Sequence, residues 1–277
     1  MKIMYCTDIH GSKKRYKKIL NIHEKFDLTI IGGDILPKNI YYGNIWEIQE
    51  SFIKDFFPKY FDEFKTPLII DFGNDDHECN YLDFINLVLK YDHVYNIHLK
   101  ESIINNISFI GMNNVPDYPF GLKDWCRKDN DEYIIDSKQL GIPCTSTKKG
   151  YKNINNLKKH YNQRLSIEKI LDTLLPSSMS EECIYLFHSP PRMLGLDVCL
   201  RGECVGSRAI TNWILKNNPK ILFSGHIHES PEVSGKYFNK LENTLCIQPG
   251  QSYKSNELTY CSFYLNDVEK TLKRETI

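Results

Sequence analysis

Short apolar runs that each lead into polar side chains, mostly aspartate and histidine, limit how this chain can fold more than any other sequence feature. Residues 2–6 lead into Asp8 and His10, and residues 28–31 lead into Asp34. The arrangement recurs as residues 67–70 with Asn74, Asp75, Asp76 and His77, residues 184–187 with His188, and residues 221–223 with His226 and His228. Continuous apolar runs of this length are typical of strands buried in a parallel sheet. We therefore expect several parallel strands that deliver polar side chains to one edge.

Helical periodicity separates the first three runs. Residues 14–26 and 45–64 carry apolar side chains at three- and four-residue spacing. A strand, helix, strand, helix, strand order favours right-handed crossovers and a parallel α/β sheet. Ligands of such sheets bind beyond the carboxyl ends of the strands, which is where the polar motifs are expected to meet.

The second half of the chain has more β character and one long irregular segment. We expect a hairpin over residues 102–112 around Asn105-Asn106, because such an asparagine pair suits a tight turn. The pattern predicts helices over residues 156–175 and 207–216, and strands over 245–247 and 260–265. Loops as long as residues 113–155 are usually functional or disordered. We interpret residues 1–277 as a single domain with an irregular insertion at about 113–155.

Composition and charge exclude several classes of protein. The chain is 41% hydrophobic and 25% charged, which is typical of a globular protein and not of a disordered one. Its 35 basic and 35 acidic residues cancel, so no net charge attracts nucleic acid. No apolar run approaches the about 18 residues of a membrane span, and the first run is too short for a signal peptide. With nine scattered cysteines, an odd number, we expect free thiols and a cytoplasmic location.

Each polar motif alone is a weak signal, but together they argue for metal binding. The seven candidate ligands are Asp8, His10, Asp34, Asn74, His188, His226 and His228. So many polar groups in one crevice would be costly to desolvate without a cation. Mixed imidazole and carboxylate ligands suit Zn, Fe or Mn better than Mg or Ca. Seven ligands exceed the three or four of one catalytic ion, which favours two ions that share a bridging carboxylate.

In their order along the chain, these motifs resemble those of the calcineurin-like metallophosphoesterases. The matching motifs are Asp8-x-His10, Gly33-Asp34, Gly73-Asn74, His188-Ser189-Pro190-Pro191, Val205-Gly206-Ser207-Arg208-Ala209-Ile210 and Gly225-His226-Ile227-His228-Glu229-Ser230. The last three are most similar to a branch of small prokaryotic phosphoesterases. The resemblance runs from residue 3 to about residue 250. It implies a four-layer αββα sandwich of two mixed β-sheets flanked by helices.

The resemblance also implies a distribution of the seven ligands over two metal ions. The first ion would be bound by Asp8, His10 and His228. The second would be bound by Asn74, His188 and His226, with Asp34 as the bridge. Two divalent transition-metal ions are expected, with manganese preferred and iron, zinc or nickel as alternatives.

The function implied is that of a dinuclear metal-dependent hydrolase of phosphate esters, a phosphodiesterase or phosphatase with a metal-bridging hydroxide as nucleophile. We expect a small phosphorylated substrate, no membrane partner and no nucleic-acid partner, and the oligomeric state stays open. One alternative is a non-catalytic metal-binding scaffold of the same fold, against which the complete ligand set argues. The other is a nuclease, against which the neutral charge and the lack of a recognisable binding module argue.

Two positions depart from the family pattern. The family commonly has a histidine directly after the ligand asparagine, where it helps to protonate the leaving group, and here that position is Asp75. Beside two cations Asp75 should stay charged and donate protons poorly. His77 has a better-placed pKa, although an exposed histidine before a helix is the alternative. Asp75 and His77 are therefore both candidate catalytic residues. Members of this branch often have a histidine where this chain has Cys204. This departure implies either different contacts with the substrate or only a different loop at this position.

Aromatic residues in the insertion offer two interpretations. Tyr118, Phe120, Trp125 and Tyr133 could stack on a nucleobase or anchor the loop. We favour a lid that governs substrate choice rather than the chemical step, because lid elements mainly position the substrate and exclude water.

Overall fold

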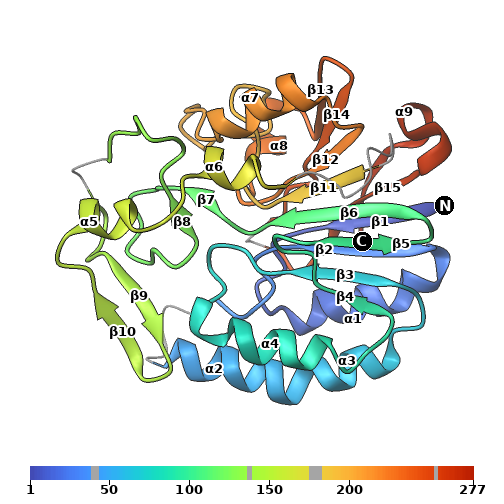
Figure 1. Cartoon of the computed structure of the whole chain (residues 1–277). Coiled ribbons are helices and arrows are strands. Elements are labelled where there is room, and N and C mark those ends of the chain that lie inside the picture. The colour runs from blue at the N-terminus through green and yellow to red at the C-terminus, as the bar shows by residue number, and fades with distance from the viewer. Residues whose placement is uncertain (39–43, 136–138, 175–182, 253–254) are drawn as a thin grey trace.

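Two six-stranded β-sheets lie face to face in the computed structural model of the chain, and helices cover both outer faces (Figure 1). The structure describes residues 1–38, 44–135, 139–174, 183–252 and 255–277. The four-layer αββα sandwich expected from the sequence is confirmed. Among the described residues, no helix is both long and apolar enough to cross a membrane.

The first sheet is parallel at its centre and antiparallel at one edge. Its strands, in spatial order, are β16 (Lys273–Thr276), β15 (Thr259–Tyr264), β1 (Lys2–Cys6), β2 (Leu28–Gly32), β3 (Leu68–Asp71) and β4 (Val94–Tyr95). Strands β1 to β4 are parallel, and β15 joins β1 in antiparallel register. The parallel strands therefore place their carboxyl ends at one edge, as the sequence predicts.

The second sheet is built in the same way. Its strands are β13 (Phe238–Leu241), β14 (Thr244–Ile247), β12 (Ile221–Phe223), β11 (Cys183–Phe187), β6 (Ile107–Met112) and β5 (Glu101–Ile104). Strands β14, β12, β11 and β6 are parallel, whereas β13 and β5 pair in antiparallel register. The predicted hairpin joins β5 to β6, and Asn105 and Asn106 both adopt the left-handed conformation that a tight hairpin turn requires.

Helices pack on the outer face of each sheet. On the first sheet lie α1 (Lys13–Ile22), α2 (Ile45–Ser51), a π-helical turn (Phe52–Phe56), α3 (Phe57–Glu63) and α4 (Tyr81–Val88) (Figure 1). The remaining helices are α5 (Leu157–Asn162), α6 (Ile167–Leu171), α7 (Arg208–Asn217), α8 (Ser230–Ser234) and α9 (Val268–Thr271). Short 3₁₀ turns cover His23–Lys25, Glu78–Asn80 and Leu265–Asp267. Helices α6 and α7 cover the second sheet (Figure 1).

The alternation of side chains along β1 shows how the layers are held together. Ile3 and Tyr5 point into the apolar core between the two sheets, whereas Met4 and Cys6 point into the core under the helices. Both faces of a central strand are thus buried, which explains why these strands are apolar throughout and do not alternate with polar residues.

The prediction of one continuous helix over residues 156–175 is wrong, because two short helices occupy this segment. Helix α5 ends at Asn162 and α6 begins at Ile167, after Ser166 as N-cap. The first N–H groups of α6 donate to carbonyls of the insertion, from Ile167 to Lys128 at 2.9 Å and from Glu168 to Asp129 at 3.0 Å. A continuous helix would need those N–H groups for itself, so the tertiary contact divides it. Residue 175 lies outside the described residues.

The insertion contains regular structure at two places. Strands β7 (Val115–Pro116) and β8 (Cys126–Arg127) form a short parallel pair, and β9 (Cys144–Thr147) and β10 (Gly150–Asn153) form a hairpin. Residues 136–138 of the insertion lie outside the described part of the chain. The interpretation as one domain with an insertion stays a prediction. All nine cysteines have free thiols, as expected.

A carboxyl group is buried between the sheets at the end of β3. Asp71 is 2% exposed, and the side-chain amide of Asn96 donates to it. Tyr81 in turn donates its hydroxyl hydrogen to Asn96 at 2.9 Å. Burial raises the pKa of Asp71 to about 8. The folded protein therefore holds a proton here that an exposed aspartic acid would release.

This proton predicts a pH dependence of stability. The ordinary pKa of the carboxyl is 3.8, so between that pH and about 8 the folded chain binds more protons than the unfolded chain. The free energy of unfolding should therefore fall as the pH rises through this window, by up to about 1.4 kcal/mol per pH unit from this group. Asp71→Asn should flatten the dependence. Urea unfolding at several pH values measures it, with the exposed Asp92→Asn as matched control. Equal pH slopes for wild type and Asp71→Asn would contradict the prediction.

Candidate metal centre

The polar motifs meet at the carboxyl ends of strands from both sheets. The first sheet contributes Asp8, His10, Asp34 and Asn74 from the segments after β1, β2 and β3. The second sheet contributes His188, His226 and His228 from the segments after β11 and β12. Both sheets are therefore needed to assemble one centre.

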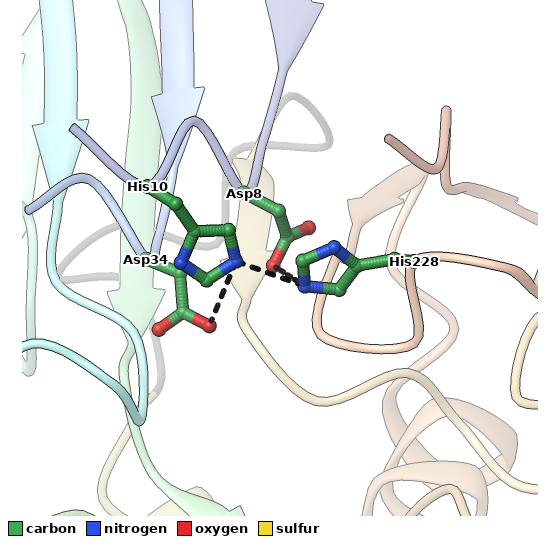
Figure 2. Close-up of side chains that lie close together, drawn as sticks. All are labelled: Asp8, His10, Asp34 and His228. Carbon is green, nitrogen blue, oxygen red and sulfur yellow. Dashed lines mark hydrogen bonds and ion pairs between the residues drawn. The ribbon is translucent and has the colours of Figure 1, made fainter. Parts of the chain in front are cut away.

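Four of these side chains form a first cluster (Figure 2). Asp8, His10, Asp34 and His228 each offer one donor atom, and these atoms lie within 4.8 Å of one another. The Nε2 atoms of His10 and His228 are 3.1 Å apart. Nε2 of His228 lies 3.2 Å from Oδ1 of Asp8, and Nε2 of His10 lies 3.9 Å from Oδ2 of Asp34. This set includes the three residues assigned to the first ion and the predicted bridge.

A second cluster shares one member with the first. Donor atoms of Asp34, His188 and His226 also lie within 4.8 Å of one another. Nε2 of His188 is 3.5 Å from Oδ2 of Asp34 and 3.0 Å from Oδ1 of Asn74. The arrangement brings all seven sequence-predicted ligands together and places Asp34 in both clusters.

The backbone at several of these positions is strained. Asp8, His10, Asp34 and His226 have φ of 57°, 49°, 49° and 68°, in the left-handed region that residues other than glycine seldom adopt. Such conformations cost about 1–3 kcal/mol each and persist only where surrounding structure enforces them. Their concentration at one place is typical of a functional site.

Two glycines allow the strand ends to approach the centre closely. A Cβ atom at Gly73 would lie 2.2 Å from Oδ1 of Asp34. At Gly33, where φ is +83°, a Cβ atom would lie 2.2 Å from Nδ1 of His188. Any side chain at either position would displace a candidate ligand, so the chain requires glycine at both.

The protonation of these groups suits metal binding. Burial lowers the pKa of both His10 and His226 to about 3, so their imidazoles stay neutral and keep a lone pair for a cation. Burial opposes the ionisation of Asp8, but the nearby His228 outweighs it and lowers the pKa of Asp8 to about 2. At His188, burial lowers the pKa of the imidazole, but the nearby Asp34 outweighs burial and raises that pKa to about 9. A metal ion must therefore displace a proton from His188.

One buried nitrogen supports the same conclusion. Nε2 of His226 is buried and has no hydrogen-bond partner among the described residues. A buried ring nitrogen without a partner is costly, and a metal ion would satisfy it. The donor set of imidazole nitrogens, carboxylates and one amide oxygen therefore fits two transition-metal ions.

Asp76 holds together the segments that follow β2 and β3. Its carboxyl group accepts backbone N–H bonds from Ile35 at 3.0 Å, Leu36 at 2.7 Å and Gly73 at 2.8 Å. These donors flank Asp34 and Asn74, so one buried side chain sets the distance between two candidate ligands. The sequence motif includes Asp76, but its spacing does not indicate this bracing role.

Asp75 is paired with a lysine that no sequence motif indicates. Nζ of Lys38 lies 2.5 Å from Oδ2 of Asp75, and both side chains line the cavity beside the clusters. Burial raises the pKa of Asp75 to about 6, Asp34 adds to this, and Lys38 opposes it. In the protein alone the carboxylate is thus less readily ionised than expected beside two cations. Lys38 has no sequence signal, because it is one of 35 basic residues and lies outside every motif.

His77 lies apart from the two clusters. Its side chain is 2% exposed, so the alternative of an exposed histidine is wrong. Nε2 of His77 is 3.2 Å from the hydroxyl of Tyr151 in β10, and its ring meets that of Tyr151 edge-on. His77 therefore contacts the insertion rather than the candidate metal ligands.

The insertion's aromatic residues divide into anchors and a cavity wall. Trp125 is buried and donates from Nε1 to the carbonyl of Asp76 at 2.6 Å. Tyr133 donates to the carbonyl of Asp117 at 2.8 Å. Tyr118 and Phe120 line the cavity that contains Asp34, Asn74, His226 and His228.

Cys204 lies in the segment between β11 and α7, beside this cavity. Its backbone bridges Val198, and its neighbours Glu203 and Val205 line the cavity. The departure at this position therefore belongs to a loop that borders the centre.

Comparison with known families identifies a family for this chain. The family model for calcineurin-like phosphoesterases matches residues 1–230, which include all seven candidate ligands. No protein among curated sequences matches the chain.

Solved structures show a similar fold at low sequence identity. One crystal structure is 15% identical with a TM-score of 0.61, and the match covers 99% of this chain and 98% of that one. TT1561 of Thermus thermophilus is 14% identical with a TM-score of 0.55, covering 100% and 97% of the two chains. A hypothetical protein from the same organism is 11% identical with a TM-score of 0.50, covering 100% and 99%. These likenesses show the fold alone.

The shared carboxylate predicts how metal content responds to substitution. Fully loaded wild type should bind two transition-metal ions per chain, because two clusters are present. Asp34→Ala should weaken both sites, since its carboxylate belongs to both, whereas His228→Ala should affect mainly one. Metal analysis after equilibrium dialysis measures this. His93→Ala, whose imidazole contacts the carbonyl of Phe61 outside both clusters, serves as control. One ion or none per folded wild-type chain would refute the assignment.

Proposed function

Because the chain belongs to the calcineurin-like phosphoesterase family, we propose that it is a dinuclear metal-dependent hydrolase of phosphate esters. The single observation that carries this proposal is Asp34, whose carboxylate lies in both clusters of candidate ligands. A carboxylate in that position is suited to hold two ions at a short, fixed separation.

Each part of the centre has a proposed role. When bound, the two ions supply an activated water and neutralise the charge that develops on the phosphoryl oxygens. Asp8, His10 and His228 would hold one ion, and Asn74, His188 and His226 the other. Manganese is our first expectation for the metal, with iron, zinc and nickel as alternatives.

The leaving group would face Lys38 and Asp75. Both line the cavity with Asp34 and Asn74, and the 2.5 Å ion pair holds the ammonium in place. Lys38 would stabilise negative charge on the departing oxygen, with Asp75 as its positioning residue. His77 contacts Tyr151 instead, so it is not assigned to this step.

The first test is hydrolysis itself. Metal-free protein loaded separately with manganese, zinc, iron or nickel should hydrolyse aryl phosphate monoesters or diesters with at least one metal. Asp34→Ala should lower kcat by about a hundredfold or more, because stabilisation of the transition state is lost. His93→Ala should retain activity. A wild type that binds two ions but hydrolyses no ester, nucleotides included, would instead support the scaffold alternative.

The second test concerns the leaving group. With no histidine beside Asn74, we expect activity to fall steeply as the leaving group becomes more basic. Aryl esters of graded leaving-group pKa measure this on wild type, Lys38→Met, Asp75→Ala and His77→Ala. Lys38→Met should steepen the dependence, and His77→Ala should not change it.

Two outcomes would overturn this assignment. A flat wild-type dependence that becomes steep only in Asp75→Ala would make Asp75 the proton donor. The same result only in His77→Ala would give that role to His77.

A further inference from the structure

The cavity beside the metal centre has two chemically different walls. Its volume of about 740 Å³ is in the range of small-molecule sites, roughly 300–1,000 Å³, and exceeds what a phosphoryl group alone would occupy. One part of the lining consists of candidate metal ligands. Another part, here called the apolar wall, comes from the insertion and from the loop that contains residues 199–205, and it consists of Tyr118, Pro119, Phe120, Leu140, Cys199, Leu200 and Val205.

Three large apolar side chains in this lining are open to solvent. Phe120 is 51% exposed, Leu140 is 79% exposed and Leu200 is 77% exposed. Single exposed apolar residues are common, but these three line the same cavity as the candidate metal ligands, and Phe120 and Leu200 come from separate loops. A ligand held at the metal centre could therefore cover Phe120 and Leu200 together.

Tyr118 connects the two loops and the metal centre. Its ring packs against His226, with centroids 4.7 Å apart, and against Phe120, with centroids 6.1 Å apart. Its hydroxyl donates to the carbonyl of Val205 at 2.5 Å. The apolar wall is therefore fixed relative to a candidate metal ligand.

A buried ion pair contacts the backbone of Tyr118 in this wall. Nζ of Lys123 lies 2.8 Å from Oδ1 of Asp117, and the two side chains are 0% and 1% exposed. Lys123 also donates to the carbonyl of Tyr118, and the hydroxyl of Tyr161 donates to Asp117. These buried contacts fix the backbone at Tyr118, two residues before Phe120, so that less ordering of this loop is needed when a ligand binds.

The charged residues of the lining do not favour an additional anionic group. Lys38 and Arg201 are accompanied by Asp75, Glu203 and Glu229. Since both signs are present, the apolar wall is the feature that distinguishes one ester group from another.

We propose that Phe120 and Leu200 form a subsite for an aromatic or other apolar ester group, so that the substrate class is phosphate esters of aryl or similarly apolar alcohols. This inference rests on the proposed function, because the phosphoryl group must occupy the metal centre for its ester group to reach the wall.

Binding of non-hydrolysable phosphonates tests the subsite without catalysis. Benzylphosphonate and methylphosphonate share the anionic group and differ in the apolar part. Calorimetry on metal-loaded wild type should give a Kd about tenfold lower for benzylphosphonate. The double variant Phe120→Ala, Leu200→Ala should reduce this ratio to about twofold. The ratio is the readout, because damage to the metal centre changes both constants together.

A matched control uses exposed apolar residues elsewhere. Phe238 in β13 is 43% exposed and Leu89 after α4 is 70% exposed, and neither lines the cavity. Phe238→Ala, Leu89→Ala should keep the wild-type ratio. A wild-type ratio near one, or an unchanged ratio in the Phe120 and Leu200 variant, would overturn the subsite. A protein with the expected ratio that hydrolyses no phosphate ester would overturn the proposed function and leave the subsite intact.

Discussion

Three backbone N–H groups that converge on the carboxyl group of Asp76 are the interaction on which the centre most depends. They come from Ile35, Leu36 and Gly73, on the segments that carry Asp34 and Asn74. Buried donors left without an acceptor cost about 1–3 kcal/mol each, so the two segments are strongly held to this one side chain. The carbonyl of Asp76 also accepts from Trp125, which joins the insertion to the same point.

The ends of the strands were predictable from the sequence because two signals coincide there. An apolar run identifies each buried strand, and the polar residues within the next few positions must lie at the sheet edge. Asp8, Asp34 and His188 are identified in this way. The division of the strands between two sheets could not be read from the same runs, because strands of both sheets are equally apolar. The family resemblance implies two sheets, but not which strand belongs to which sheet.

Other features depend on contacts between distant segments, which periodicity does not record. The helix over residues 156–175 is broken because N–H groups of α6 bond to Lys128 and Asp129. Lys38 belongs to the candidate site because it forms an ion pair with Asp75. His77 contacts Tyr151 of the insertion instead of the candidate metal ligands. Among the aromatic residues of the insertion, composition does not distinguish the buried anchor Trp125 from the exposed Phe120.

The origin of the candidate ligands from both sheets has a consequence for folding. Asp8, His10, Asp34 and Asn74 follow strands of the first sheet, and His188, His226 and His228 follow strands of the second. An ion held by donors from both sheets would cross-link the first and last thirds of the chain at the open edge of the sandwich. Because such an ion would bind only the assembled state, its concentration would determine how tightly the two sheets are coupled, and the heat unfolding of loaded protein would measure ion affinity.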